Sequence, residues 1–278
     1  MLPVSFSNSG SLIQMKICNK NTTNVHTKII PVIGIGSDGN NAIKKLEKEH
    51  LMNFSPQTIL PKIKKDKNDI LPAFIITGPE DTITRLSLLE TINHCKDIGY
   101  TTTVIIRDDS YRMPKLSYQL NDWIKCVSKC CHSFIVFPTC NLSISSFFSR
   151  LDNIFNPLLS IIQMDMGDLA YFLKDTGEWT IGWNFAMGEN AAKNAIPHAV
   201  QSATTNSLQH PGKMLVHFQV SENTPLYNID EAIDYVFKLP NFDEMTLHFT
   251  VTIEEGFYNQ TNVSVMAGDF QEKQKIIS

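Results

Sequence analysis

Apolar residues gather along this chain in short runs that polar, glycine-containing segments separate. The first run covers residues 28–35 (KIIPVIGI), and its near-continuous apolar character is typical of a parallel strand buried on both faces. Similar runs at residues 73–77, 103–106 and 134–137 predict three more buried strands. Segments with helical spacing lie between these runs. Strands that alternate with helices predict a parallel sheet covered by helices on both faces.

The helical segments are defined by where their apolar residues recur. A first helix is predicted to open at residues 40–45, directly after the glycines that follow the first strand. In the next helix, one apolar face is formed by Leu86, Leu89, Ile92 and Cys95. The face of a third helix is formed by Trp123, Ile124, Val127 and Cys131.

The second half of the chain has a different pattern. Helices are predicted at residues 151–162, 169–173, 186–200 and 229–237, the last with Asn228 as its N-cap and Glu231 as the reciprocal capping residue. Strands are predicted at residues 214–220, 245–253 and 263–267. This mixture indicates a smaller α+β domain. The predicted organisation is an arm (1–27), an α/β domain (28–162), a loop and connecting helix (163–185), the α+β domain (186–270) and a polar tail (271–278).

Composition narrows the class of protein. The chain has 278 residues, enough for two packed domains or one large one, and its composition, 42% hydrophobic and 19% charged, is that of ordinary globular proteins. A formal net charge of -4 gives no reason to expect nucleic acid as a partner. No apolar run reaches the ~18 residues of a membrane span, so no membrane insertion is expected. The six cysteines lack the paired spacing of a zinc site, which predicts no metal centre and a reduced, cytoplasmic setting.

The glycines after the first strand are candidates for binding an anion. Gly34, Gly36 and Gly39 allow a tight turn and a close ligand approach, and the following helix would direct free N–H groups toward that turn. Two other interpretations stay open. The spacing also fits the dinucleotide fingerprint GxGxxG, but no acidic residue closes a next strand in the stretch HLMNFSPQTIL. The glycines can equally serve a tight turn without a ligand.

Six segments in collinear order resemble the FtsZ/tubulin superfamily, and FtsZ more than tubulin. The glycine loop GIGSDGNNAI resembles the family's GVGGGGxNAV, and IIQMDMGDLAYFL resembles its synergy loop, LxNVDFADVRTVM. The other four are DIGYTTTVIIR, SFIVFPTCNL, GWNFAMGENAAKNAI and VSVMAGDF. The resemblance covers residues 28–270. It implies a tubulin-type nucleotide-binding domain joined to the smaller domain.

The resemblance also implies a site shared between subunits, in which glycine loops hold GTP or GDP with Mg²⁺ and the next subunit's synergy loop supplies carboxylates. The nucleotide-binding positions carried over are Gly34, Gly36, Ser37, Gly39, Asn40, Asn41, Gly78, Thr82 and Thr84. The catalytic positions are Gln163, Asp165 and Asp168. As hard oxygen ligands, the two aspartates could position water or metal. The alternative is that they only cap the helix that follows.

The family's second glycine box, GGGTGTG, is lost in this chain. Collinear alignment through Gly78 puts residues 80–86 in its place, with Glu80 and Asp81 adding negative charge and Asp38 adding more from the first loop. At an effective dielectric constant of ~20, like charges ~4 Å apart cost about 4 kcal/mol, roughly three decades of affinity. The segments on either side of this box are also shorter than in FtsZ. The sequence therefore predicts an impaired GTP site.

Two functional hypotheses follow. The first is an FtsZ-like protein of the cytoskeleton or of cell division, whose own GTP site is impaired and whose synergy-loop face docks on another copy or on an intact FtsZ, joining or capping a filament. The second is an active, divergent GTPase that self-assembles and uses Thr82, Thr84 and Arg85 with a metal in place of the glycine box.

Overall fold

The computed structural model describes residues 30–49, 51–57, 71–108, 116–138, 143–156, 158–174, 176–204, 211–240 and 242–268. The predicted arm at 1–27 and the tail at 271–278 lie outside these residues. The strands are β1 (Ile30–Gly34), β2 (Phe54–Gln57), β3 (Leu71–Thr77), β4 (Tyr100–Asp108), β5 (Ser133–Pro138), β6 (Ser160–Ile162), β7 (Gly177–Met187), β8 (Lys213–Val220), β9 (Thr246–Ile253) and β10 (Gln260–Gly268). The helices are α1 (Gly36–Leu46), α2 (Thr82–Asp97), α3 (Leu116–Val127), α4 (Ile144–Phe155), α5 (Met166–Leu173), α6 (Ala191–Ala203), α7 (Leu226–Phe237) and the 3₁₀ turn η1 (Phe242–Glu244).

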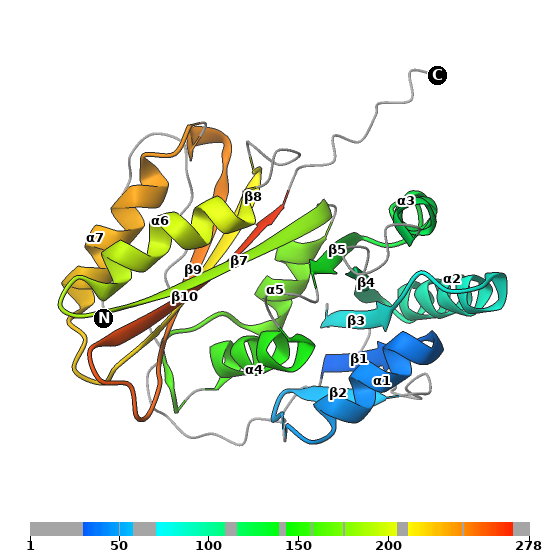
Figure 1. Ribbon diagram of the computed structural model, residues 1–278, viewed down its shortest axis with the longest axis horizontal. Helices are drawn as coiled ribbons and strands as arrows, with labels where there is room; N and C mark the ends of the chain where they lie inside the picture. The colour runs from blue at the N-terminus through cyan, green and yellow to red at the C-terminus, as the bar shows by residue number, and fades with distance from the viewer. Residues whose placement is uncertain are drawn as a thin grey trace.

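One hydrogen-bonded sheet runs through both halves of the described chain (Figure 1), in the order β2-β1-β3-β4-β5-β7-β10-β8-β9-β6. The strands from β2 to β5 pair in parallel, and β5 continues in parallel to β7. Antiparallel pairs join β7 to β10 and β10 to β8, and β8 pairs in parallel with β9. The predicted mostly parallel sheet with helices is therefore confirmed.

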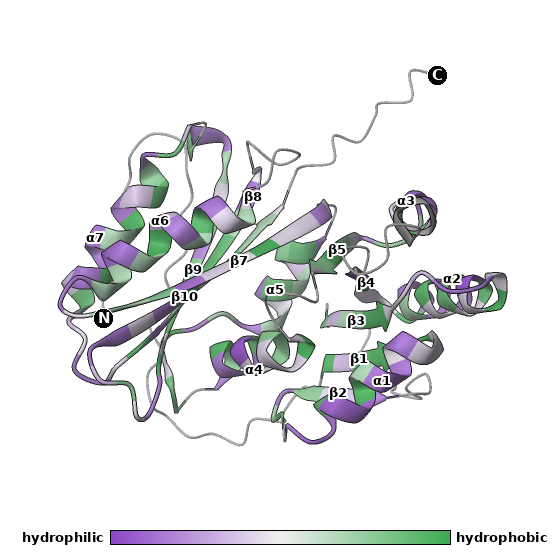
Figure 2. Cartoon of the chain, viewed as in Figure 1, coloured by the Kyte–Doolittle hydropathy of each residue, from purple (hydrophilic) through white to green (hydrophobic). Residues whose placement is uncertain are grey.

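Alternate side chains of the parallel strands enter two cores. On β3, Phe74 and Ile76 pack with α1, α4 and α5, whereas Ala73 and Ile75 pack with α2 and α3. Parallel strands buried in this way need an apolar residue at nearly every position, which explains the continuous apolar runs. In Figure 2, apolar and polar residues alternate around α1 and α6, whose apolar sides supply buried residues to the cores.

The second half is covered mainly on one face. There α6 and α7 pack on β8, β9 and β10 through residues such as Ile196, Val216 and Val265. On the opposite face, Leu215 and Met266 join the same core as Phe148 of α4, so α4 lies between the two halves of the molecule (Figure 1). None of the described helices is long and apolar enough to cross a bilayer.

Several predicted elements differ from the structure. The first helix begins at Gly36 rather than near residue 40. The helix predicted at 151–162 is wrong, because α4 ends at Phe155 and β6 follows. Asn156 has the extended conformation that is expected before a proline, with φ -77° and ψ 109°. The helix predicted at 186–200 begins only at Ala191, and Ala186 belongs to β7, which the sequence pattern did not reveal.

One local prediction about a helix face is partly wrong, and one about a helix cap is wrong. On α2, Ile92 and Cys95 are buried as predicted, but Leu86 is 57% exposed and Leu89 is half-buried, and Leu88 and Thr91 complete the buried face. Asn228 lies inside α7, whose N-cap position is Pro225, and its side-chain amide donates to the carbonyl of Glu189 at 2.8 Å. Glu231 pairs with Lys193 of α6 at 3.7 Å instead of completing a capping box.

Candidate functional site

The turn from β1 into α1 is shaped by glycines that allow close packing. Gly36 has φ +77°, a conformation that favours glycine. A Cβ on Gly34 would lie 2.6 Å from the carbonyl oxygen of Gly39, and a Cβ on Gly39 would overlap the carbonyl oxygen of Ile76. Gly34 and Gly39 therefore bring the start of α1 directly onto β1 and β3. Their presence has a packing reason that needs no ligand.

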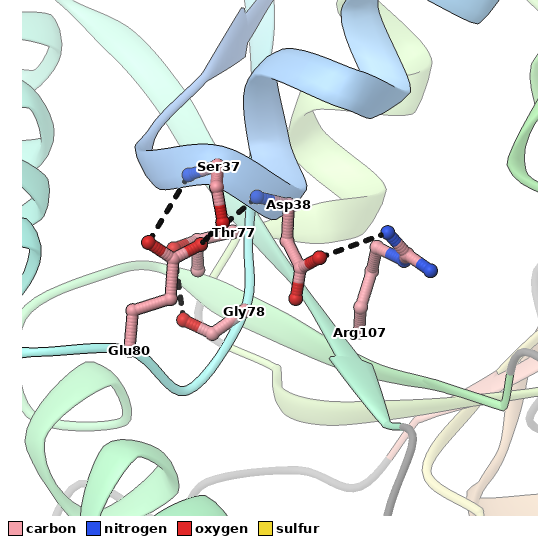
Figure 3. Close-up of polar contacts among 6 residues, drawn as sticks. All are labelled: Ser37, Asp38, Thr77, Gly78, Glu80 and Arg107. Atoms are coloured by element: carbon pink, nitrogen blue, oxygen red, sulfur yellow. Dashed lines mark hydrogen bonds and ion pairs between the residues drawn. The ribbon is translucent and has the colours of Figure 1, made fainter.

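The first turn of α1 is capped by a side chain from another loop. Ile35, at the N-cap position, makes no side-chain cap hydrogen bond. Instead the Glu80 carboxylate, from the loop between β3 and α2, reaches the turn (Figure 3). Its Oε2 accepts from the backbone N–H of Ser37 at 3.1 Å, and its Oε1 accepts from the backbone N–H of Asp38 at 2.9 Å and from Ser37 Oγ at 3.0 Å. A carboxylate at this end of a helix is favoured by the helix dipole.

Asp38, the neighbouring acid, points away from Glu80 toward Arg107 at the end of β4 (Figure 3), and the closest oxygen and nitrogen are 3.3 Å apart. The Asp38 carboxylate also fills the space beside Gly78, where any Cβ would overlap it. Arg107 partly neutralises the acid that the sequence places in the first loop. Gly78 is thus required for this contact, independently of any ligand.

The third acid, Asp81, has a local task. It is the N-cap of α2 and accepts a hydrogen bond from the backbone N–H of Thr84 at 2.8 Å. That hydrogen bond is the main cause that lowers the pKa of Asp81 below its usual value. The Thr84 hydroxyl donates to Glu80 Oε2 at 3.4 Å. Asp81 and Thr84 therefore hold the loop that carries Glu80.

The structure brings together only some of the predicted nucleotide-binding residues. Gly36, Ser37, Gly78 and Thr84 surround the Glu80 and Asp38 carboxylates. Thr82 and Asn41 are exposed on the first turn of α2 and on α1. The Asn40 Oδ1 atom is buried and has no hydrogen-bond partner among the described residues.

With Glu80 in this position, the loop does not fit a phosphate group. The two N–H groups and the Ser37 hydroxyl that could bind phosphate oxygens are already donated to carboxylate oxygens. Among the described residues, no group of three or more His, Cys, Asp or Glu side chains is placed to hold a metal ion.

The predicted catalytic residues, Gln163, Asp165 and Asp168, lie in the segment 163–168, which we call the α5 loop. Asp165 is the N-cap of α5 and accepts from the backbone N–H of Asp168 at 2.7 Å, while Asp168 Oδ2 accepts from the backbone N–H of Asp165 at 3.4 Å. The Gln163 amide donates to the carbonyl of Phe155 at 3.1 Å. The capping role that the sequence left open is thus present. A catalytic role for these residues stays a prediction.

Sequence reasoning missed two features of the first loop. It treated Glu80 only as a repulsive neighbour of a phosphate, whereas the carboxylate is a hydrogen-bond acceptor for α1. It also missed Arg107 as the partner of Asp38. A signal was available: Arg107 closes a predicted buried strand, and parallel neighbours of the first strand place such terminal residues at the same sheet edge as the loop.

Comparisons of sequence and of structure find proteins that are similar to this chain. No protein-family model matches the chain. The cell division protein FtsZ of Mycoplasmopsis pulmonis is 30% identical over 118 residues, which span 42% of this chain and only 30% of that protein. An FtsZ dimer from M. jannaschii superposes with a TM-score of 0.68 at 16% identity, covering 88% of this chain and 89% of the other. CetZ2 from Haloferax volcanii, in a GTPγS-bound protofilament, gives a TM-score of 0.64 at 11% identity, with 89% and 95% covered.

Proposed function

We propose that this chain, which has the same fold as solved FtsZ and CetZ2 structures, is an FtsZ-like cytoskeletal subunit with an impaired GTP site of its own. In this proposal it works in the cytoplasm and docks through the α5 loop on another copy or on the nucleotide-bearing face of an intact FtsZ. The similar structures are a dimer and a protofilament, which supports self-association as the general mode of action.

The main observation in favour of an impaired GTP site is the position of Glu80. Its carboxylate accepts the hydrogen bonds of Ser37 and Asp38 that a phosphate would need. A nucleotide would have to displace this carboxylate and would then face both Glu80 and Asp38 as negative charges. Phosphate binding at a helix N-terminus depends on free N–H groups. Because the N–H groups of Ser37 and Asp38 already donate to Glu80, we expect phosphate binding to be weaker.

The docking surface is supported by the geometry of the α5 loop. Asp165 is exposed and Asp168 is partly exposed, and the reciprocal capping hydrogen bonds fix both carboxylates at the start of α5. On the same helix, Tyr171 is 71% exposed. Two ordered carboxylates beside an exposed aromatic ring form a surface that can contact a neighbour without rearrangement.

The first test is a calorimetric titration of the protein with GTP and Mg²⁺. We expect no saturable heat, because the donors of the first loop are already used by Glu80. The alternative function, an active GTPase that relies on Thr82, Thr84 and Arg85, predicts saturable binding and hydrolysis that rises steeply with protein concentration. Such binding would remove the claim of an impaired site and favour the alternative.

The second test concerns docking, with Asp165→Asn as the informative variant. Asparagine is as good an N-cap as aspartate, so this change removes the charge and keeps the start of α5. When the protein is mixed with an intact, GTP-bound FtsZ, we expect the native protein to change filament assembly or GTP turnover and Asp165→Asn or Asp165→Ala to lose most of that effect.

The matched control for docking is Asp230→Asn, which removes one exposed acid from α7. We expect this variant to act like the native protein. If the native protein leaves FtsZ assembly and turnover unchanged, docking on FtsZ is excluded. If Asp230→Asn is as impaired as Asp165→Asn, the effect comes from net charge and not from the α5 loop.

A further inference from the structure

We propose that Glu80 is a built-in anion, which replaces the phosphate of a nucleotide within the chain itself and blocks the start of α1 against outside anions. This inference rests on the proposed impaired site and adds its cause: one displaceable side chain, rather than a loop that has lost all capacity to bind anions. The Glu80 carboxylate has the same chemistry as the phosphate that it replaces, since both are anions that accept several hydrogen bonds.

The contacts of Glu80 are those of a bound ligand. Both oxygens accept hydrogen bonds, at 2.9, 3.0 and 3.1 Å, and the donors include two consecutive N–H groups in the first turn of α1. Glu80 lies 43 residues from Ser37 in the sequence, so this is a tertiary contact and not a local helix cap. Within the described chain it supplies what α1 lacks, because the N-cap residue Ile35 has no side-chain acceptor.

The pocket for the carboxylate is shaped by Gly36. A Cβ at this position would lie 2.6 Å from Glu80 Oε2 and 2.7 Å from Oε1, so a larger residue would force the carboxylate to move, and the φ of +77° also favours glycine. In this protein, the glycine admits the Glu80 side chain to the first turn of α1. Close backbone approach of this kind is a usual reason for glycine in such loops.

Glu80 is also held from its own side. Asp81 caps α2 through the backbone N–H of Thr84 at 2.8 Å, and the Thr84 hydroxyl donates to Glu80 Oε2 at 3.4 Å. The loop that carries Glu80 is therefore also held by contacts with the start of α2. A ligand tethered in this way acts at an effective concentration on the order of millimolar or more, which a free anion must exceed to displace it.

The remaining charge does not prevent anion binding once Glu80 is removed. Asp38, the other acid at this turn, pairs with Arg107 at 3.3 Å, so its charge is partly balanced. The N–H groups of Ser37 and Asp38, with the Ser37 and Thr84 hydroxyls, would then be released together. Such a group of donors at the N-terminus of a helix binds inorganic phosphate.

The test is thermal unfolding of the full chain in inorganic phosphate and in chloride at the same ionic strength. In chloride we expect Glu80→Ala to lower the Tm by about 3 °C, because α1 loses its cap. Phosphate should recover most of this loss in Glu80→Ala and should raise the Tm of the native protein much less. Glu80→Gln, which fills the same space without charge, should respond to phosphate to an intermediate degree and covers the case in which Glu80→Ala does not fold.

The matched control is Glu90→Ala, which removes an exposed acid from the middle of α2 and leaves the loop that carries Glu80 unchanged. We expect no larger phosphate response from it than from the native protein. An equal response of all variants to phosphate, or no loss of Tm in Glu80→Ala, would contradict the proposal that Glu80 is a built-in anion. The GTP titration tests a different proposal. Saturable GTP binding by the native protein would contradict the proposal of an impaired GTP site. Failure of phosphate to stabilise Glu80→Ala would contradict only the proposal that Glu80 is a built-in anion.

Discussion

Replacing Gly39 by alanine is expected to destabilise the protein by about 3 kcal/mol and to lower its Tm by roughly 8 °C. A Cβ at this position would overlap the carbonyl oxygen of Ile76 in β3 and would lie 3.0 Å from the carbonyl carbon of Gly34 in β1. Both neighbours are backbone atoms of central strands, so they cannot move aside as a flexible side chain would. Denaturant unfolding followed by circular dichroism measures the loss.

The matched control is Asn41→Ala, an exposed position on the same helix. Because alanine is the better helix former, this variant should keep or slightly raise stability, by about 0.5 kcal/mol. The comparison also separates two reasons for the glycine. If Gly39 serves only the approach of a ligand, Gly39→Ala will unfold like the native protein, and close packing of α1 on the strands is not the reason for this glycine.

Acid is expected to destabilise the protein through His217, which is buried on β8. Burial, with a smaller contribution from the Arg150 charge, lowers the pKa of His217 from 6.5 to about 3. Its Nε2 contacts Thr252 Oγ1 at 2.9 Å, and its Nδ1 is buried without a hydrogen-bond partner among the described residues. The folded protein therefore keeps this imidazole neutral where the unfolded chain would protonate it.

The direction of the effect follows from proton uptake. Between pH 6.5 and about pH 3 the unfolded state binds one more proton at His217 than the folded state, so stability falls as the pH falls through this window. The slope is about 1.4 kcal/mol per pH unit at most from this residue. The measurement is the free energy of unfolding from urea titrations at a series of pH values.

Carboxylates also titrate in acid, so the informative quantity is the difference between variants. His217→Gln should reduce the slope below pH 6.5 even if it lowers stability at neutral pH, because glutamine takes up no proton. His198→Gln changes an exposed histidine on α6 and should leave the profile as in the native protein. Equal slopes for the native protein and His217→Gln would exclude His217 as the source of acid sensitivity.

Local pattern was enough to predict much of the first half of the fold. The apolar runs at 73–77 and 134–137 became β3 and β5, because strands buried on both faces need apolar residues at nearly every position. The glycine turn after the first strand was also predicted correctly, and Gly36 has the positive φ that such a turn uses. The resemblance of ordered motifs predicted the FtsZ/tubulin fold that the structural comparisons then showed.

Long-range contacts decided what the pattern could not. The strand β7 lies between β5 and β10, and its mixed composition becomes a strand only because both edges find hydrogen-bonding partners far away in the sequence. The exposure of Leu86 depends likewise on where α2 rests on the sheet.

The first loop separates the two contributions most clearly. The sequence by itself was enough to predict a tight turn at glycines 34, 36 and 39 and a negative charge that opposes a phosphate there, because residue type fixes backbone freedom and charge. Only the tertiary structure decided that Glu80 faces α1 while Asp38 faces Arg107, because the direction of a charged side chain depends on donors that packing brings within about 3 Å. The Glu80 charge, which the sequence alone suggests would repel a phosphate, therefore caps α1 in the folded protein.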